Sequence, residues 1–182
     1  MSEDRASWQI KDEEALDELI QLMGLRSEDG AILQALAPTA AAYGPTLTKT
    51  FYDRLFAHPQ TAEYLQGMDM QRLHGMVQEW FMGMFQGGYD REYARRRLYI
   101  GEVHVKVGLP VRYPLAMIDV VMSFGDQIAQ ASDQPAAALQ AFQKVLTLDI
   151  AIFNQAYEDN QLRHLAELVG GERLARRLLT GT

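Results

Sequence analysis

The sequence predicts an all-α protein, and three of its features lead to that prediction. Apolar residues recur every three or four positions, which is the spacing of an amphipathic helix. The clearest such stripe contains Leu73, Met76, Val77, Trp80, Phe81 and Met84. Nowhere do apolar and polar residues alternate singly, as a half-buried strand requires. The chain of 182 residues is also long enough for one substantial core, without internal repeats or low-complexity linkers.

Seven helices are expected, in the order in which the periodic stretches follow one another. They cover about residues 13–23, 28–36, 39–57, 68–86, 90–107, 113–131 and 135–169. The turns between them contain glycine, proline or short polar residues, which end helices. A short link at 61–66 and an amphipathic piece after Gly170-Gly171 complete the chain.

Single residues refine these boundaries. Pro38 separates the second and third predicted helices. Pro45 within the third predicts a bend or a fresh start, because proline removes a backbone donor. Ser27 gives only half of a capping signal for the second helix, since Gly30 stands where a capping box has Glu. Asp90 is a good N-cap for the fifth helix.

The composition excludes several classes of function. The chain has no cysteine, so it can form no disulfide, thiolate metal site or thioether-linked bilin. Its formal net charge of −7 argues against a nucleic-acid partner, which requires a basic face. We expect no apolar run long enough to span a bilayer and hence no membrane insertion. The first residues lack a signal-peptide pattern, so the expected location is the cytoplasm.

One of the four histidines differs from the others in its surroundings. His104 shares a helix face with Ile100 and Val107, and no other metal-binding side chain lies along that segment. The other three, which are expected to be solvated, are His58, His74 and His164. A lone histidine on an apolar face is either a core residue bonded to a backbone carbonyl or a ligand of heme iron.

Three segments resemble the globin domain of the globin-coupled sensors, the family that includes the protoglobins. They are Phe51-Tyr-Asp-Arg-Leu-Phe56, Arg72-Leu-His-Gly-Met-Val77 with its continuation Met84-Phe-Gln-Gly87, and the block from Ile100 to Tyr113. The most specific signal is the order of histidine, then Gly-Leu-Pro, then tyrosine in the last block. The resemblance covers about residues 25–160 and implies a sensor-type globin fold with an extra N-terminal helix.

The resemblance also implies a heme b cofactor and assigns its contacts. His104 is the implied proximal ligand of the iron. Tyr52 is the implied distal hydrogen-bond donor to O₂, the alternative being a core tyrosine bonded to a carbonyl. Leu73 and Met76 are implied on the distal face, where many relatives carry a hydroxyl residue at the second position. Met76 cannot donate, and it is expected either to fill space or to ligate the iron as a sixth ligand. The other expected heme contacts are Phe51, Val77, Trp80, Val107 and Tyr113.

Two further expectations concern the surface. Arg95-Arg-Arg97 is expected on a solvated helix face, with a contact to a heme propionate as the alternative. The helices at 113–131 and 135–169 carry apolar residues around more of their circumference than one core-facing stripe needs. In the family these two helices pair across a two-fold axis, so we expect a homodimer through them.

The expected domains are an N-terminal extension at 1–24, a sensor globin domain at 25–169, and a tail or link to an output domain at 170–182. The resemblance implies a heme-based sensor of O₂ that also binds CO and NO and signals to an output domain or partner protein. We expect no enzyme activity in this chain itself. Two alternatives stay open, a heme-free globin module for regulatory interactions and a heme enzyme acting on NO or O₂.

Overall fold

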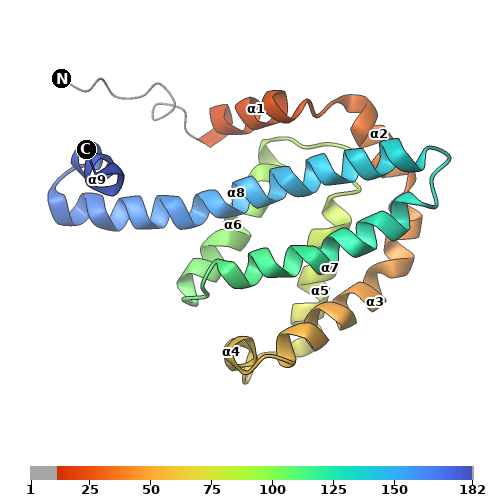
Figure 1. The fold of residues 1–182 in the computed structure, drawn as a ribbon, viewed down its shortest axis with the longest axis horizontal. Helices are drawn as coiled ribbons and strands as arrows, with labels where there is room; N and C mark the ends of the chain where they lie inside the picture. Colours follow the sequence, from red (N-terminus) through yellow and green to blue (C-terminus); the bar gives the residue numbers. More distant parts are fainter. Residues whose placement is uncertain (1–11, 182) are drawn as a thin grey trace.

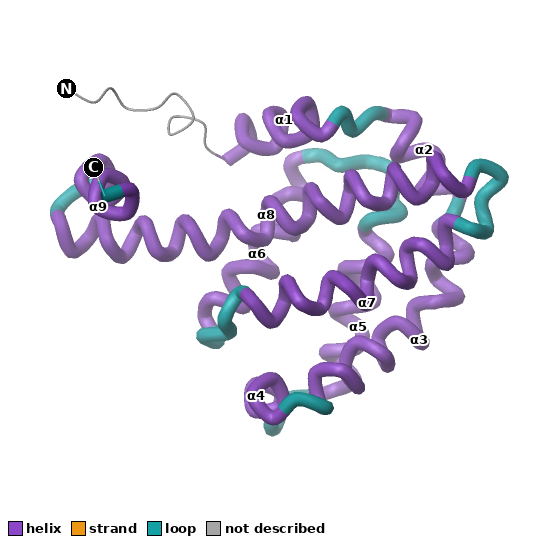
Figure 2. Tube along the Cα trace, in the orientation of Figure 1, coloured by secondary structure: helices purple, strands orange, loops and turns teal. Residues whose placement is uncertain are grey.

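The computed structural model describes residues 12–181, and every regular element among them is a helix. Figure 1 labels the helices and Figure 2 shows the loops between them. They are α1 (Asp12–Met23), α2 (Ser27–Ala35), α3 (Ala37–Phe56), α4 (Pro59–Ala62), the 3-10 helix η2 (Glu63–Leu65), α5 (Met70–Gly83), α6 (Arg91–Lys106), α7 (Arg112–Ala129), α8 (Pro135–Val169) and α9 (Glu172–Thr180). The all-α prediction is confirmed. Residues 1–11 of the predicted N-terminal extension lie outside the described residues.

Helix α8 organises the fold. It runs along the length of the molecule, with α7 beside it and α5 and α6 crossing behind (Figure 1). It packs against α1, α2, α6, α7 and α9, and its contact with α6 is the most extensive in the described chain. Helix α3 packs against α5 and α7. The segments α3, α5, α6, α7 and α8 therefore surround a common interior, in which the candidate site lies.

The prediction for Pro38 is confirmed, because α2 ends and α3 begins beside it, whereas the prediction for Pro45 is not. Pro38 lies in the first turn of α3, where the missing N–H has no partner to lose. Pro45 lies inside the helix, which continues through it to Phe56, so the predicted fresh start is wrong. Packing offsets the local cost of about 3 kcal/mol, because α3 buries Gly44 and Leu47 on either side of this turn.

Two helix ends also differ from the prediction. The N-cap of α2 is Arg26, whose backbone N–H donates to the Asp29 carboxylate at 2.8 Å, and Ser27 is already helical. The Asp29 carboxylate therefore replaces the missing Glu of the capping box. Helix α5 ends at Gly83 and is followed by tighter turns, so the boundary near residue 86 was set too late. The N-cap Asp90 is confirmed, because its carboxylate accepts the Tyr93 N–H at 2.9 Å.

Most apolar side chains of α7 and α8 pack against other helices of the same chain. The buried side of α8 includes Ala138, Ala141, Phe142, Val145, Leu146, Leu148, Asp149, Ile152 and Ala156. From Asp119 onward, the exposed positions of α7 are Asp119, Ser123, Asp126 and Gln127. Neighbouring helices on several sides of α8 explain why its apolar residues exceed one stripe. The excess is therefore not by itself evidence for a second chain.

The expectation that no apolar run could span a bilayer was too strict. Helix α8 contains an 18-residue window of mean hydropathy 1.3, and by length and composition it could cross a membrane. In this fold, 44% of that window is buried inside the molecule. A core helix that neighbours cover on several sides is apolar around most of its circumference, because most of its side chains are removed from water, as they are in a membrane span.

Candidate functional site

A cavity of about 280 Å³ lies between α3, α5, α6, α7 and α8, and its lining is almost entirely apolar. All nine residues that the sequence assigns to a cofactor site line this cavity. They are Phe51, Tyr52, Leu73, Met76, Val77, Trp80, His104, Val107 and Tyr113. The structure therefore brings together residues of α3, α5, the end of α6 and the start of α7.

His104 presents one ring nitrogen for a ligand interaction. It is half-buried in the last turns of α6, and its Nδ1 lies 2.7 Å from the Ile100 carbonyl oxygen. A carbonyl can only accept, so Nδ1 carries the proton and Nε2 keeps its lone pair. Burial lowers the pKa of His104, with the bond to Ile100 opposing the shift, and this favours the neutral imidazole. Both the ring orientation and the charge state suit a metal ligand.

Tyr52 is the principal polar side chain that α3 contributes. It is buried, and its hydroxyl donates to the Leu73 carbonyl oxygen on α5 at 3.1 Å. Burial raises the pKa of Tyr52 to about 12, so the phenol keeps its proton and stays a donor. In this structure Tyr52 is therefore a core tyrosine bonded to a backbone carbonyl, which was the alternative to an O₂ donor. Any other acceptor must compete with the Leu73 carbonyl for the hydroxyl proton.

His74 has a role that the sequence did not reveal. Its ring stacks on the Tyr52 ring, with centroids 4.7 Å apart and planes inclined by 13°. It is half-buried, so the prediction that it is solvated is wrong. The stack holds the Tyr52 ring against α5. His58 and His164 are exposed, as expected.

Four large apolar side chains around the cavity remain uncovered. Their exposed fractions are 48% for Met68, 43% for Met76, 53% for Val107 and 39% for Leu115. Apolar side chains left exposed beside an apolar cavity are typical of a ligand pocket. A flat hydrophobic cofactor such as heme fits this lining, and His104 is the histidine among the lining residues that could ligate it.

A buried ion pair lies at the inner side of the cavity and corrects the prediction for Arg97. Arg97 is 4% exposed rather than solvated, and its Nε lies 3.0 Å from the Asp149 Oδ2 on α8. Its Nη2 donates to the Trp80 carbonyl oxygen at 2.8 Å, and its guanidinium lies 4.3 Å from the Tyr93 ring centroid. The Tyr93 hydroxyl donates to the other Asp149 oxygen. Only Arg95 and Arg96 of the triplet lie on an exposed face.

The carboxylate of this pair titrates in an unusual range. Burial raises the pKa of Asp149 to about 6, and the opposing influence of Arg97 and the hydrogen bond from Tyr93 do not cancel it. Both Arg97 and Asp149 line the cavity. Arg97 and Asp149 are the charged residues among those that line the cavity, and each neutralises the buried charge of the other.

We expect Arg97→Met to lower the free energy of unfolding by about 3–5 kcal/mol, because it leaves the Asp149 charge buried without its partner. The double variant Arg97→Met/Asp149→Leu removes both charges and is expected to recover much of this loss. Urea unfolding at neutral pH measures both values. A double variant no more stable than Arg97→Met would show that uncompensated charge is not the cause.

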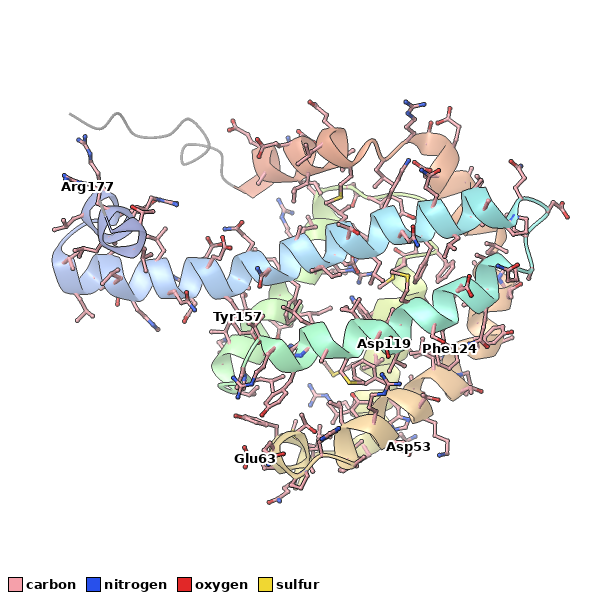
Figure 3. All side chains as sticks on the ribbon, in the orientation of Figure 1. Asp53, Glu63, Asp119, Phe124, Tyr157 and Arg177 are labelled. Atoms are coloured by element: carbon pink, nitrogen blue, oxygen red, sulfur yellow. The ribbon has the colours of Figure 1, made fainter. Side chains whose placement is uncertain are left out.

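The segment after His104 is tied to α8 by a second polar contact. The Tyr157 hydroxyl donates to the Leu109 carbonyl oxygen at 2.8 Å, in the turn that joins α6 to α7. Figure 3 labels Tyr157 on α8, beside this turn. The His104 ring also contacts Phe153 of α8 edge-on, with centroids 5.2 Å apart. The end of α6 that carries His104 therefore rests on α8.

An all-helical fold around an apolar cavity, with His104 among the lining residues, is the arrangement that the globin resemblance predicts. The family model described as Protoglobin matches residues 12–163, so the chain belongs to this family. The predicted resemblance and globin fold are thereby confirmed.

Known relatives agree with this assignment. The heme-based aerotactic transducer HemAT of Halobacterium salinarum is 28% identical over 161 residues, covering 80% of this chain and 33% of the transducer. The chain thus spans about a third of the length of this curated relative. The globin domain of a Geobacter sulfurreducens globin-coupled sensor is 31% identical with a TM-score of 0.73, over 78% of this chain and 96% of that one.

A more distant structure shares the fold alone. The ferric globin domain of E. coli DosC is 20% identical with a TM-score of 0.64, over 78% of this chain and 98% of that one. The family model covers residues 12–163, from α1 into α8, and these solved structures share the globin fold.

Proposed function

We propose that this chain is a heme-based gas-sensing domain that holds heme b in the cavity and takes O₂ as its principal ligand. The observation that carries the proposal is His104, whose Nδ1 is committed to the Ile100 carbonyl while Nε2 is available beside an apolar cavity. The heme iron would supply a coordination position for O₂, CO or NO. The chain supplies the iron ligand, the apolar enclosure and the hydrogen-bond donors.

Heme uptake can be followed through Trp80, which lines the cavity. Hemin added to the apo-protein is expected to quench tryptophan fluorescence and to saturate at one hemin per chain. Quenching without saturation would indicate adsorption to the surface and would count against the site. The variant Trp80→Phe reports how much of the signal arises in the cavity.

Tyr52 is proposed as the donor to bound O₂. Its hydroxyl lies at the cavity and makes one bond, to the Leu73 carbonyl, which it can exchange for another acceptor. The hydroxyls of Thr61 and Tyr64 also line the cavity and likewise donate to backbone carbonyls, those of Leu55 and Gly108, so this bonding does not by itself distinguish Tyr52. Tyr113 accepts from Arg112 at 3.5 Å. Met76 supplies no donor, and we assign O₂ to Tyr52 because the resemblance to the globin-coupled sensors implies a distal tyrosine at this position.

A ligand-dependent movement of His104 would pass from α6 into α8. The His104 ring contacts Phe153, and Tyr157 holds the following turn. Both contacts lie on the same helix, one turn apart. We infer that α8, which continues to Val169 beyond the globin core, transmits the signal toward an output domain or partner.

We also propose that two chains pair through α7 and α8. Sedimentation of the unmodified protein should give about twice the mass of the 20.6 kDa chain. Charged substitutions at the exposed Ser123 and Thr147, which lie on these two helices, should lower the apparent mass. An unmodified protein that stays monomeric at high micromolar concentration would contradict the pairing.

A further inference from the structure

The interface between α6 and α8 contains an apolar contact at Gly101 and a charged contact between Arg97 and Asp149. At its centre the two helices approach closely at Gly101, where an added Cβ would lie 2.7 Å from both the Ala156 Cβ and the Phe153 carbonyl oxygen. Van der Waals contacts of this kind fix the spacing of the two helices. The Arg97–Asp149 pair adds a buried charged contact to the same interface.

We propose that the buried Arg97–Asp149 pair is a further coupling contact, beside those of Phe153 and Tyr157, through which a movement of the His104 helix shifts α8. The proposal rests on the proposed heme-sensing function and names the side chains that connect the site to the helix leading out of the domain. Neither the proposed iron ligand His104 nor the proposed O₂ donor Tyr52 requires a charged pair between α6 and α8.

Arg97 and His104 move together because both belong to α6. They are seven residues apart, about two helical turns, so they lie on the same face, and both line the cavity. A helical segment of this length behaves as a rigid rod. A displacement of His104 along or about the α6 axis is therefore carried to Arg97.

Arg97 cannot follow such a displacement without acting on its neighbours. Its guanidinium is held by the Trp80 carbonyl of α5 at 2.8 Å and lies against the Tyr93 ring. A Cβ at Gly83 would lie 2.4 Å from Nη2, so the guanidinium fills the space that this glycine leaves. The side chains of Arg97 and Asp149 are 5% and 3% exposed. Water is therefore not available to replace either partner.

The geometry of the pair is also sensitive to small shifts. Arg97 Nε and Asp149 Oδ2 are 3.0 Å apart, yet neither atom makes a well-aligned hydrogen bond. A buried polar atom without an aligned partner is uncommon, and its energy depends strongly on small changes of angle. A slight movement of α6 therefore changes the strength of this contact, and α8 must adjust to it through Asp149.

Hydrogen–deuterium exchange of the heme-loaded chain tests this coupling. Exchange along α8 is compared between the ferrous protein without ligand and the same protein at CO saturation, verified by absorption. We expect CO to change exchange in the Val145–Ala156 region of the unmodified chain. In Arg97→Met/Asp149→Leu the CO-dependent change in this region should be clearly smaller than in the unmodified chain, because only the contacts of Phe153 and Tyr157 remain.

A matched control removes a different ion pair of the same helix. Lys144 of α8 contacts Asp29 of α2 at 2.8 Å, away from the cavity. Lys144→Met should leave the CO-dependent change in α8 intact. If the double variant does not fold, Asp149→Asn, which removes the charge but keeps an acceptor for the Tyr93 hydroxyl, is expected to show the same reduction.

The outcomes separate this proposal from the proposed function. A protein that takes up no heme, seen by its missing Soret band before any exchange experiment, refutes the proposed function and the coupling with it. A heme-loaded protein in which CO leaves α8 exchange unchanged, or in which the variant responds as the unmodified chain does, overturns the coupling alone.

Discussion

Replacing His104 with alanine is expected to abolish the Soret band of the purified protein. If some heme stays bound, its spectrum should change, and exogenous imidazole should restore the spectrum of the unmodified protein. His104 is the histidine that lines the cavity, and its Nε2 is the ring nitrogen not bonded to the Ile100 carbonyl. Its loss leaves an apolar pocket without a strong ligand for iron, whereas free imidazole fits the space of the missing ring. Absorption spectra with and without imidazole measure both effects.

Control variants are available among the exposed histidines. His58→Ala and His164→Ala should keep the spectrum of the unmodified protein, because neither residue lines the cavity. Full heme content and an unaltered spectrum in His104→Ala would show that another group ligates the iron. The assignment of α6 as the proximal helix would then be wrong.

The second large effect is expected for Tyr52→Phe, which should speed O₂ dissociation by about one to two powers of ten. A hydrogen bond to a partly charged acceptor contributes about 1.5–3 kcal/mol, which corresponds to this range of rates. Phenylalanine keeps the ring that stacks on His74 and removes only the hydroxyl. Stopped-flow measurement of O₂ and CO release gives the two rates.

The contrast between the two gases makes the test specific. Bound CO carries less negative charge on its oxygen, so its dissociation should respond much less to the loss of the donor. Tyr64→Phe removes another hydroxyl at the cavity, one that lies 3.5 Å from the Gly108 carbonyl, and should change neither rate strongly. Equal changes for O₂ and CO in Tyr52→Phe would mean that the pocket has loosened and that Tyr52 is not the donor.

The sequence predicted the elements that have strong local signals. Helix α8 begins at Pro135 and ends at Val169 as expected, because proline opens it and Gly170 takes the left-handed conformation that closes it. The apolar neighbours of His104 distinguished it from the other histidines, and the family resemblance then implied its role as iron ligand, which stays a prediction. The nine predicted contacts line one cavity. These features depend on periodicity, on helix punctuation and on the family resemblance, all of which a single sequence contains.

The features that were missed depend on tertiary packing. Arg97 stands in a run of three arginines, which suggests a solvated face, but it lies seven residues before His104 and hence on the same side of α6. Asp149 is a lone acid between Leu148 and Ile150, which is the signal that could have revealed its buried partner. The stack of His74 on Tyr52 joins two helices, and no local pattern encodes it.

The most direct test of heme-based sensing is the absorption spectrum of the hemin-reconstituted protein. It is recorded after reduction under argon, then in the presence of O₂ or CO, and again after the gas is removed. We predict a Soret band at one heme per chain that shifts with each gas and returns when the gas is withdrawn. A protein with no specific Soret band after hemin addition would contradict the account and would favour a heme-free globin module.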